Sequence, residues 1–308
     1  MSMTALQSSF ADYIKTYAGD AQYDAPLAPL CSFKIGGPAE ILYTPKNEAA
    51  LLAALRFAKE SGCDRKILGN GTNLLISDDG VKGLVLRLKE GLTEMTLGEN
   101  GKISCGAGVS LKKLCTAALD AGLTGLEFAY GIPGSIGGAV YMNAGAYGGE
   151  IKTVLGSVRV IRPDTLEVIE RRADDMDIAY RSTPFMQNGE IIVSAGFALQ
   201  PGDPEAIRAK MNELMGKRKA SQPLEYPSAG STFKRPTGGY AAAMIDQSGL
   251  KGYRVGGAEV SKKHAGFVIN IDNATFADVM GVIGGVRAKV KEKFGVTLET
   301  EVEIWGEH

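Results

Sequence analysis

The sequence predicts an α/β or α+β protein with more than one domain. Its 308 residues, 44% of them apolar, are enough to bury two or three cores. Short apolar runs typical of strands, at residues 39–43, 84–88, 158–162 and 191–199, alternate with segments of helical spacing. Glycine is also unusually frequent, at 40 of the 308 residues. Because this glycine is clustered, we expect loops whose backbone wraps closely around something.

Four segments have the apolar spacing of packed helices. They are residues 47–61, residues 110–121, a stretch that opens with Asp203 and Pro204, and residues 274–294. Glycines at positions 62, 122 and 295 follow three of them, as is common where helices end. A domain boundary is expected just before Asp203, and residues 297–305 are predicted to form a final strand.

Charge and cysteine content exclude several classes of protein. The chain has 34 basic and 35 acidic residues, which argues against a surface built to bind nucleic acid or an anionic membrane. The four cysteines form no Cys-x-x-Cys pair, and only His264 and His308 could join them, so we expect no metal site. Neither a secretory signal nor a run of about 18 apolar residues is present. We therefore expect a reduced, cytoplasmic protein.

Basic residues exceed acidic ones locally. Between Lys217 and Lys263 there are nine basic and three acidic residues. Such an excess could hold a diphosphate, and it fits solvated loops with incidental lysines equally well.

The first glycine-rich segment lies between two apolar runs. It consists of Gly69, Asn70, Gly71, Thr72, Asn73 and Leu74. Its backbone N–H groups could form an anion-binding nest, with the side chains of Thr72 and Asn73 as further donors. A tight turn between strands explains the same residues without a ligand.

The second glycine-rich segment, residues 131–149, has seven glycines in nineteen residues. It lacks the Gly-Lys-Ser/Thr of a Walker loop and the Gly-x-Gly-x-x-Gly of a Rossmann fold. Unlike a flexible linker, it interleaves apolar residues such as Ile132, Ile136 and Val140 with its glycines. The segment is therefore predicted to pack closely against something.

Together, the two segments resemble the FAD-binding loops of the UDP-N-acetylenolpyruvoylglucosamine reductase (MurB) family. Further motifs similar to that family follow in order at residues 32–39, 180–185, 222–236, 264–267 and 298–302. Thr72 stands where the family usually has serine, and both residues supply a hydroxyl group. The compact length and the serine motif resemble the shorter, type II subgroup.

The resemblance implies an α+β fold, with an FAD-binding domain of the vanillyl-alcohol-oxidase type made of two α/β subdomains. An α+β substrate-binding domain would follow it. The expected limits are 1–30 for an N-terminal helical segment, 31–200 for the FAD domain with a split near residue 92, and 201–308 for the substrate domain. The resemblance also implies a monomer that binds FAD noncovalently and uses NADPH as the hydride donor.

The implied contacts to FAD lie in the two glycine-rich segments. The matching residues are Gly69, Asn70, Gly71, Thr72, Asn73, Leu74, Gly131, Pro133, Gly134, Ser135, Gly137, Gly138, Asn143, Ala144 and Gly145. No covalent flavin attachment is expected at Cys31, Cys105 or His264.

The implied reaction belongs to peptidoglycan synthesis. Hydride reaches C3 of the enolpyruvyl group of UDP-N-acetylglucosamine enolpyruvate, and negative charge develops at C2 and its carboxylate. The enzyme then needs a fixed cation or acid near this charge and a proton donor to C2. Ser231 matches the family's proton donor, Arg181 matches a bidentate cation, and Glu301 matches a carboxyl group that assists at C2 or the carboxylate.

Each of these residues has a non-catalytic explanation too. Ser231 fits a loop serine, and Arg181 fits a surface partner of the nearby aspartates. Strand alternation would place Glu301 with Glu299 and Glu303 on one solvated acidic face. Two other functions therefore stay open at this point: an oxidase with the same FAD domain, and a non-catalytic nucleotide-binding module.

Basic residues of the C-terminal domain are expected to hold the substrate diphosphate. The candidates are Lys219, Lys234, Arg235 and Lys262. Arg235 stands where the other subgroup has an asparagine. His264 is expected to be a packed or substrate-loop histidine instead of a base.

Overall fold

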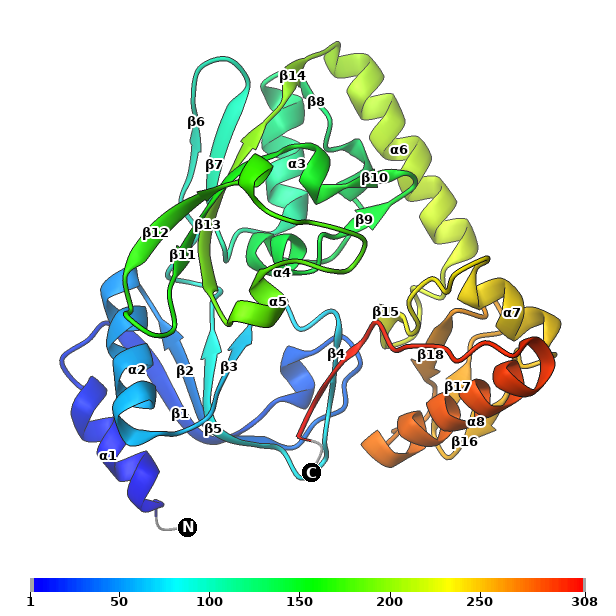
Figure 1. Ribbon diagram of the computed structural model, residues 1–308, viewed down its shortest axis with the longest axis horizontal. Helices are drawn as coiled ribbons and strands as arrows, with labels where there is room; N and C mark the ends of the chain where they lie inside the picture. The colour runs from blue at the N-terminus through cyan, green and yellow to red at the C-terminus, as the bar shows by residue number, and fades with distance from the viewer. Residues whose placement is uncertain (1–2, 307–308) are drawn as a thin grey trace. The chain divides into compact units, whose positions relative to one another are not determined.

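The computed structural model describes residues 3–306 and forms two compact units (Figure 1). Unit 1 comprises Met1–Tyr23, Ile41–Asn70 and Gly83–Lys217. Unit 2 comprises Asp24–Glu40, Gly71–Lys82 and Arg218–His308. Each unit is therefore assembled from three separate stretches of the chain.

The first sheet of unit 1 has the strand order β1-β2-β5-β3. These strands are β1 (Gly19–Pro26), β2 (Pro38–Pro45), β5 (Val81–Arg87) and β3 (Arg65–Leu68), and β3 runs parallel to β5. Helices α1 (Ala5–Ile14) and α2 (Glu48–Ser61) pack on it through a core that includes Phe10, Leu55 and Ile41. Asn47 caps α2, because its side-chain oxygen accepts the backbone N–H of Ala50 at 2.8 Å.

The second sheet of unit 1 is antiparallel, with the order β12-β11-β13-β7-β6. Its strands are β6 (Met95–Leu97), β7 (Lys102–Gly106), β11 (Leu155–Ile161), β12 (Val168–Arg172) and β13 (Ile191–Ala198). Helices α3 (Leu111–Asp120), α4 (Ile136–Tyr141) and α6 (Pro204–Ser221) share a core with this sheet. That core contains Leu114, Val158, Phe197 and Met211, and it also contains Val140 of the second glycine-rich segment.

Short elements connect these parts of unit 1. They are β8 (Leu123–Thr124), η2 (Glu127–Ala129), β9 (Gly145–Ala146), β10 (Gly149–Glu150), η3 (Ile151–Thr153), η4 (Ala173–Asp175), α5 (Phe185–Asn188) and β14 (Gln200–Pro201). Strands β9 and β10 form a small antiparallel hairpin inside the second glycine-rich segment.

Unit 2 is built on an antiparallel sheet of order β15-β18-β17-β16. Its strands are β15 (Ser228–Ser231), β16 (Arg254–Val255), β17 (Ala258–Val260) and β18 (Phe267–Asn270). Helix α8 (Phe276–Phe294) lies along this sheet and buries Val279, Ile283 and Val286 (Figure 1). Unit 2 also contains η1 (Ala28–Leu30), α7 (Ala241–Gln247) and the parallel pair β4 (Leu74–Ile76) and β19 (Glu303–Trp305).

Most predicted elements are confirmed, because they follow from local spacing. Helices α2, α3, α6 and α8 occupy the four predicted segments, and β2, β5, β11 and β13 occupy the four apolar runs. The predicted strand at 297–305 is wrong before Glu303, because Thr300 makes only an isolated bridge to Phe233. The predicted N-terminal helical segment, residues 1–30, contains α1 and the short 3-10 helix η1 with strand β1 between them. The predicted domain limits remain predictions.

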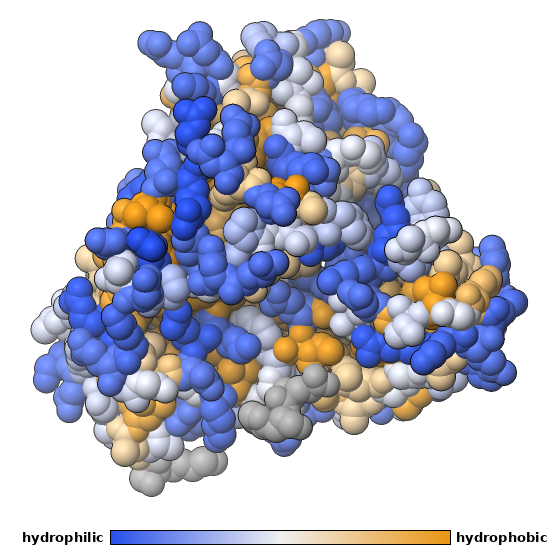
Figure 2. All heavy atoms as spheres, in the orientation of Figure 1, coloured by the Kyte–Doolittle hydropathy of each residue, from blue (hydrophilic) through white to orange (hydrophobic). Residues whose placement is uncertain are grey.

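Figure 2 shows the polarity of one face of the molecule. On the face shown in Figure 2, hydrophilic residues predominate and apolar residues form small separate groups. Within residues 3–306, no helix combines the length and apolar character needed to span a membrane. The same residues contain no group of three or more His, Cys, Asp or Glu placed to hold a metal, and His308 lies outside them.

Candidate active site

The first glycine-rich segment meets the second one closely in unit 1. The side-chain amide of Asn70 donates to the carbonyl oxygen of Pro133 at 3.1 Å. A Cβ atom on Gly69 would lie 2.5 Å from Oγ of Ser135, a residue with 1% exposure. Glycine at position 69 therefore leaves room for the side chain of Ser135.

The first backbone N–H groups of helix α4 donate hydrogen bonds within the protein. The N–H groups of Ile136, Gly137 and Gly138 donate to acceptors inside the protein at 2.8, 2.9 and 3.5 Å. The backbone N–H groups of Gly134 and Ser135, just before the helix, have no acceptor among the described residues. A bound anion would find its donors before the helix and not in its first turn.

Asn143 turns the segment after α4 and is 1% exposed, with φ of 41°. Its Nδ2 donates to Oε2 of Glu150 at 2.7 Å and to the carbonyl of Ala179 at 3.1 Å. Its Oδ1 accepts the backbone N–H of Lys152 at 3.0 Å. Both N–H groups of this side chain, which the sequence assigned to FAD, are therefore used within the protein.

Arg181, predicted to be catalytic, reaches the same segment. Its Nη1 donates to the carbonyl of Asn143 at 3.0 Å, and its Nη2 donates to the carbonyl of Gly145 at 3.4 Å. The guanidinium also lies 5.0 Å from the ring centre of Tyr180. The structure thus brings the predicted arginine onto backbone that was predicted to bind the cofactor.

In unit 2, residues of the first glycine-rich segment lie beside Glu301. The carbonyl of Gly71 accepts the N–H of Ser32 at 2.9 Å. Nδ2 of Asn73 donates to the carbonyl of Glu301 at 3.0 Å, and the N–H of Glu303 donates to the carbonyl of Asn73 at 3.0 Å. The parallel pairing of β4 with β19 causes this proximity, since the two strands continue from Asn73 and Glu301.

The remaining predicted cofactor residues flank these contacts. Gly131 precedes α4, and Ala144 follows it with its N–H donating to the carbonyl of Ala139 at 2.8 Å. In unit 2, Thr72 is half-buried and Leu74 is buried at the start of β4.

Ser231 and Glu301 are joined through Thr232, which the sequence analysis did not single out. Ser231 is exposed at the end of β15, and Thr232 is 1% exposed. The N–H of Thr232 donates to the carbonyl of Gly266 at 2.8 Å, and its carbonyl accepts the N–H of Glu301 at 2.9 Å. Its hydroxyl oxygen accepts the N–H of Val268 at 3.0 Å. Strand alternation could have shown that Thr232 lies on the face opposite to Ser231, but it gives no sign of the contact with Glu301.

His264 supports this arrangement from the loop between β17 and β18. Its Nδ1 accepts the N–H of Gly266 at 3.1 Å, and its ring meets Phe267 edge-on at 4.9 Å. Burial lowers the pKa of His264 below its usual value of 6.5, and the charge of Lys251 lowers it further. The neutral ring is therefore favoured, in agreement with a packed histidine.

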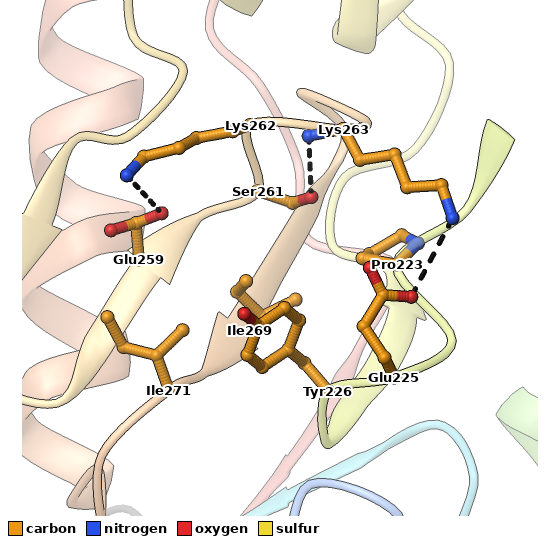
Figure 3. A pocket seen from close by; sticks show the side chains of 9 residues that line it. All are labelled: Pro223, Glu225, Tyr226, Glu259, Ser261, Lys262, Lys263, Ile269 and Ile271. Atoms are coloured by element: carbon orange, nitrogen blue, oxygen red, sulfur yellow. Dashed lines mark hydrogen bonds and ion pairs between the residues drawn. The ribbon is translucent and has the colours of Figure 1, made fainter.

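One predicted diphosphate residue, Lys262, lines a pocket of about 270 Å³ in unit 2 (Figure 3). Its Nζ lies 3.9 Å from Glu259, and Nζ of Lys263 lies 3.7 Å from Glu225 across the pocket. The lining between these ion pairs is formed by Pro223, Tyr226, Ser261, Ile269 and Ile271.

The other predicted diphosphate residues lie elsewhere in unit 2. Lys234 pairs with Glu299 at 3.4 Å, and the guanidinium of Arg235 lies 4.7 Å from the ring centre of Tyr240. The carbonyl of Lys219 accepts a hydrogen bond from Nζ of Lys263 at 2.8 Å.

The local excess of basic residues is partly balanced by acids from outside that stretch of sequence. Among the described residues, at least six of the nine basic residues pair with carboxylates: Lys217, Lys234, Lys251, Arg254, Lys262 and Lys263. Three of the partners, Glu213, Asp272 and Glu299, lie outside residues 217–263. Because exposed pairs contribute only about 0–1 kcal/mol each, these cations can exchange their partners for a phosphate.

Comparison with known proteins decides the family. An FAD binding domain model matches residues 39–168, and a model of the UDP-N-acetylenolpyruvoylglucosamine reductase C-terminal domain matches residues 222–305. A UDP-N-acetylenolpyruvoylglucosamine reductase from Clostridium novyi is 48% identical over 276 residues, 90% of this chain and 89% of that protein. The chain belongs to the UDP-N-acetylenolpyruvoylglucosamine reductase family.

Other members agree with this assignment. A reductase of the same name from Lachnoclostridium phytofermentans is 47% identical over 285 residues, 92% of each chain. The crystal structure of MurB from Thermus caldophilus matches with a TM-score of 0.79 and 33% identity, covering 94% of this chain and 100% of that one. The predicted family resemblance and α+β fold class are thereby confirmed.

The glycine-rich backbone fits FAD, the cofactor of this family. The N–H groups of Gly134 and Ser135 supply donors of the kind that a diphosphate requires. Gly138 is exposed, and a Cβ atom there would approach only Oγ of Ser135, at 3.5 Å. The segment is therefore open at Gly138, whereas at Gly149 a Cβ atom would meet the ring of Phe128 at 2.5 Å.

Replacing Gly69 by alanine should lower the FAD content of the purified protein several-fold. The new methyl group would push against Ser135 and displace the donors before α4. The ratio of flavin absorbance to protein absorbance measures this. Gly216→Ala is the matched control, because its Cβ would meet no atom within 4 Å and alanine favours a helix. Equal flavin content in the two variants would contradict the assigned role of Gly69.

Stability should fall in weak acid partly because of His264. Its lowered pKa means that the unfolded chain binds a proton more readily, so this contribution is present above about pH 6.5 and is lost as the pH falls through the lower folded value. His264→Asn keeps an acceptor for Gly266 and cannot titrate. Unfolding temperatures measured between pH 7.5 and 5 should therefore decline less in the variant. Parallel curves for the two proteins would refute this.

Proposed function

We propose that the chain catalyses the NADPH-dependent reduction of UDP-N-acetylglucosamine enolpyruvate to UDP-N-acetylmuramate, a step of peptidoglycan synthesis. Membership of the UDP-N-acetylenolpyruvoylglucosamine reductase family carries this conclusion. The match to an FAD binding domain makes the enzyme a flavoprotein. An oxidase or a non-catalytic binding module does not agree with this family. FAD, when bound, supplies the hydride that it has taken from NADPH.

Ser231 is proposed to donate the proton to C2 of the substrate. Ser231 is exposed and follows Gly230 in the chain. Gly230 has φ of 79°, and a Cβ atom there would meet no atom within 4 Å. Thr232 holds the adjacent backbone through three hydrogen bonds. A hydroxyl on such a restrained strand end can be aimed at a carbon centre with little loss of entropy.

Glu301 is proposed to assist at C2 or at the substrate carboxylate. It is half-buried, and its backbone is held by Thr232 on one side and by Asn73 on the other. The contacts through Thr232 place Glu301 near the strand end that carries Ser231. This juxtaposition within unit 2 is the structural observation that best supports the proposed acid chemistry.

Arg181 is proposed to stabilise negative charge on the substrate. Its guanidinium is oriented by two backbone carbonyls, so its position is set before substrate binds. A preoriented cation of this kind favours a charged transition state without further reorganisation.

Lys219, Lys234, Arg235 and Lys262 are proposed to bind the UDP diphosphate. Lys262 on the pocket of Figure 3 and Lys234 beside Glu299 are both held in weak ion pairs that a phosphate can replace. We further propose a cytoplasmic monomer, since free cysteines such as Cys31, Cys105 and Cys115 suit a reducing compartment.

Ser231→Ala should separate the two half-reactions. Anaerobic stopped-flow absorbance should show nearly unchanged flavin bleaching by NADPH, because the serine is not needed for that hydride transfer. Return of the flavin colour on adding the enolpyruvyl substrate should slow by roughly two to four orders of magnitude, since no other group is assigned to protonate C2.

Ser248→Ala is the control for this experiment, because it removes a serine hydroxyl that bonds the carbonyl of Met244 at 2.8 Å in the same unit. It should leave both rates unchanged. If Ser231→Ala slows both half-reactions equally, its role as the proton donor is wrong.

A further inference from the structure

The buried side chain of Asn143 links the second glycine-rich segment to the turn that carries Arg181. Its Nδ2 donates to the carbonyl of Ala179 at 3.1 Å. The same turn is closed by two hydrogen bonds between the backbones of Ala179 and Ser182, at 2.9 and 3.2 Å. Arg181 lies inside this turn with φ of 49°, a conformation that a residue with a side chain seldom adopts. The amide of Asn143 is therefore one of the contacts that hold the turn.

The side chain of Arg181 in turn bonds to the backbone of the second glycine-rich segment. The backbone carbonyl of Asn143 accepts Nη1 of Arg181 at 3.0 Å, and Gly145 accepts Nη2 at 3.4 Å. One residue thus binds the backbone of the turn with its side chain and the guanidinium with its main chain. Asn143 therefore contacts both the turn that carries the Arg181 backbone and the guanidinium at the end of its side chain.

Neighbouring groups fix the orientation of this amide. Glu150 accepts the second N–H of Asn143 at 2.7 Å and lies 3.4 Å from Nζ of Lys152. The N–H of Lys152 donates to Oδ1 of Asn143 at 3.0 Å, and its Nζ donates to the carbonyl of Ile178 at 3.4 Å. The amide faces a carboxylate on its nitrogen side and a backbone donor on its oxygen side, so only one orientation satisfies every partner.

We propose that Asn143 is a positioning residue for Arg181, and that its side chain does not serve as a ligand of FAD. This inference rests on the catalytic role proposed above for Arg181. With 1% exposure and both N–H groups engaged, the side chain offers no donor to a cofactor. Its loss would leave the half-buried carboxylate of Glu150 and the carbonyl of Ala179 without this partner and would release the turn.

Asn143→Gly tests the proposal, because glycine tolerates the positive φ and removes only the side chain. FAD content and flavin reduction by NADPH should stay near the values of the unchanged protein. Flavin reoxidation by the enolpyruvyl substrate should slow by roughly 10- to 100-fold, the cost of a small misplacement of a catalytic group. Loss of FAD with an unaffected reoxidation rate after FAD is added back would overturn the proposal.

A double-mutant cycle with Arg181→Lys distinguishes this inference from the proposed function. If Asn143 acts through Arg181, the double variant should reoxidise at about the rate of Arg181→Lys alone. Multiplication of the two single effects would overturn the positioning role. Full activity of Arg181→Lys would instead show that the arginine is not catalytic, and the proposal would fail together with that role.

Two further variants guard against a general loss of stability. Asn143→Asp keeps the shape and the tolerance of positive φ, yet sets an acceptor against Glu150 and Ala179, so it should slow reoxidation as well. Asn47→Ala removes a helix cap from the same unit, so it should lower the unfolding temperature without changing either half-reaction. A rate loss in Asn47→Ala equal to that of Asn143→Gly would overturn the proposal.

Discussion

The close approach of Gly69 to the side chain of Ser135 constrains how the two glycine-rich segments of unit 1 pack. Gly69 leaves room for the buried hydroxyl of Ser135, which in turn caps α4. The first amides of α4 bond to two backbone carbonyls and to the hydroxyl of Ser135, whereas the N–H groups of Gly134 and Ser135 have no acceptor among the described residues. The chemistry of the segment therefore depends on a glycine whose missing side chain lets a second loop come close.

The proposed catalytic side chains share one mode of support. Thr232 holds the backbone beside Ser231 and Glu301, and Asn143 holds the turn of Arg181. Both supporting residues are 1% exposed and bond mainly to backbone atoms. Hydrogen bonds in a buried setting are costly to leave unmade, so such anchors resist small displacements. The buried residues Thr232 and Asn143 therefore make the structural contacts, and the proposed catalytic side chains do not need to make them.

The basic residues of unit 2 follow a different principle. Several are paired with carboxylates, at distances such as 3.4 Å for Lys234 and 3.9 Å for Lys262. Such pairs are weak and are screened by salt. The lysines proposed to bind a diphosphate could therefore exchange these partners for it at little cost.

Helices, central strands and family membership could be predicted from the sequence because each depends on local spacing or short motifs. The pattern at 274–294 becomes α8, and the motifs around Ser231 and the glycines identify the family. The predicted last strand failed at 297–302 because pairing with β4 begins only at Glu303, and register depends on the partner strand. The sequence likewise does not reveal that Thr232 anchors Glu301 or that Asn143 faces Ala179. Only the tertiary structure decides such contacts, because they join residues far apart in the chain.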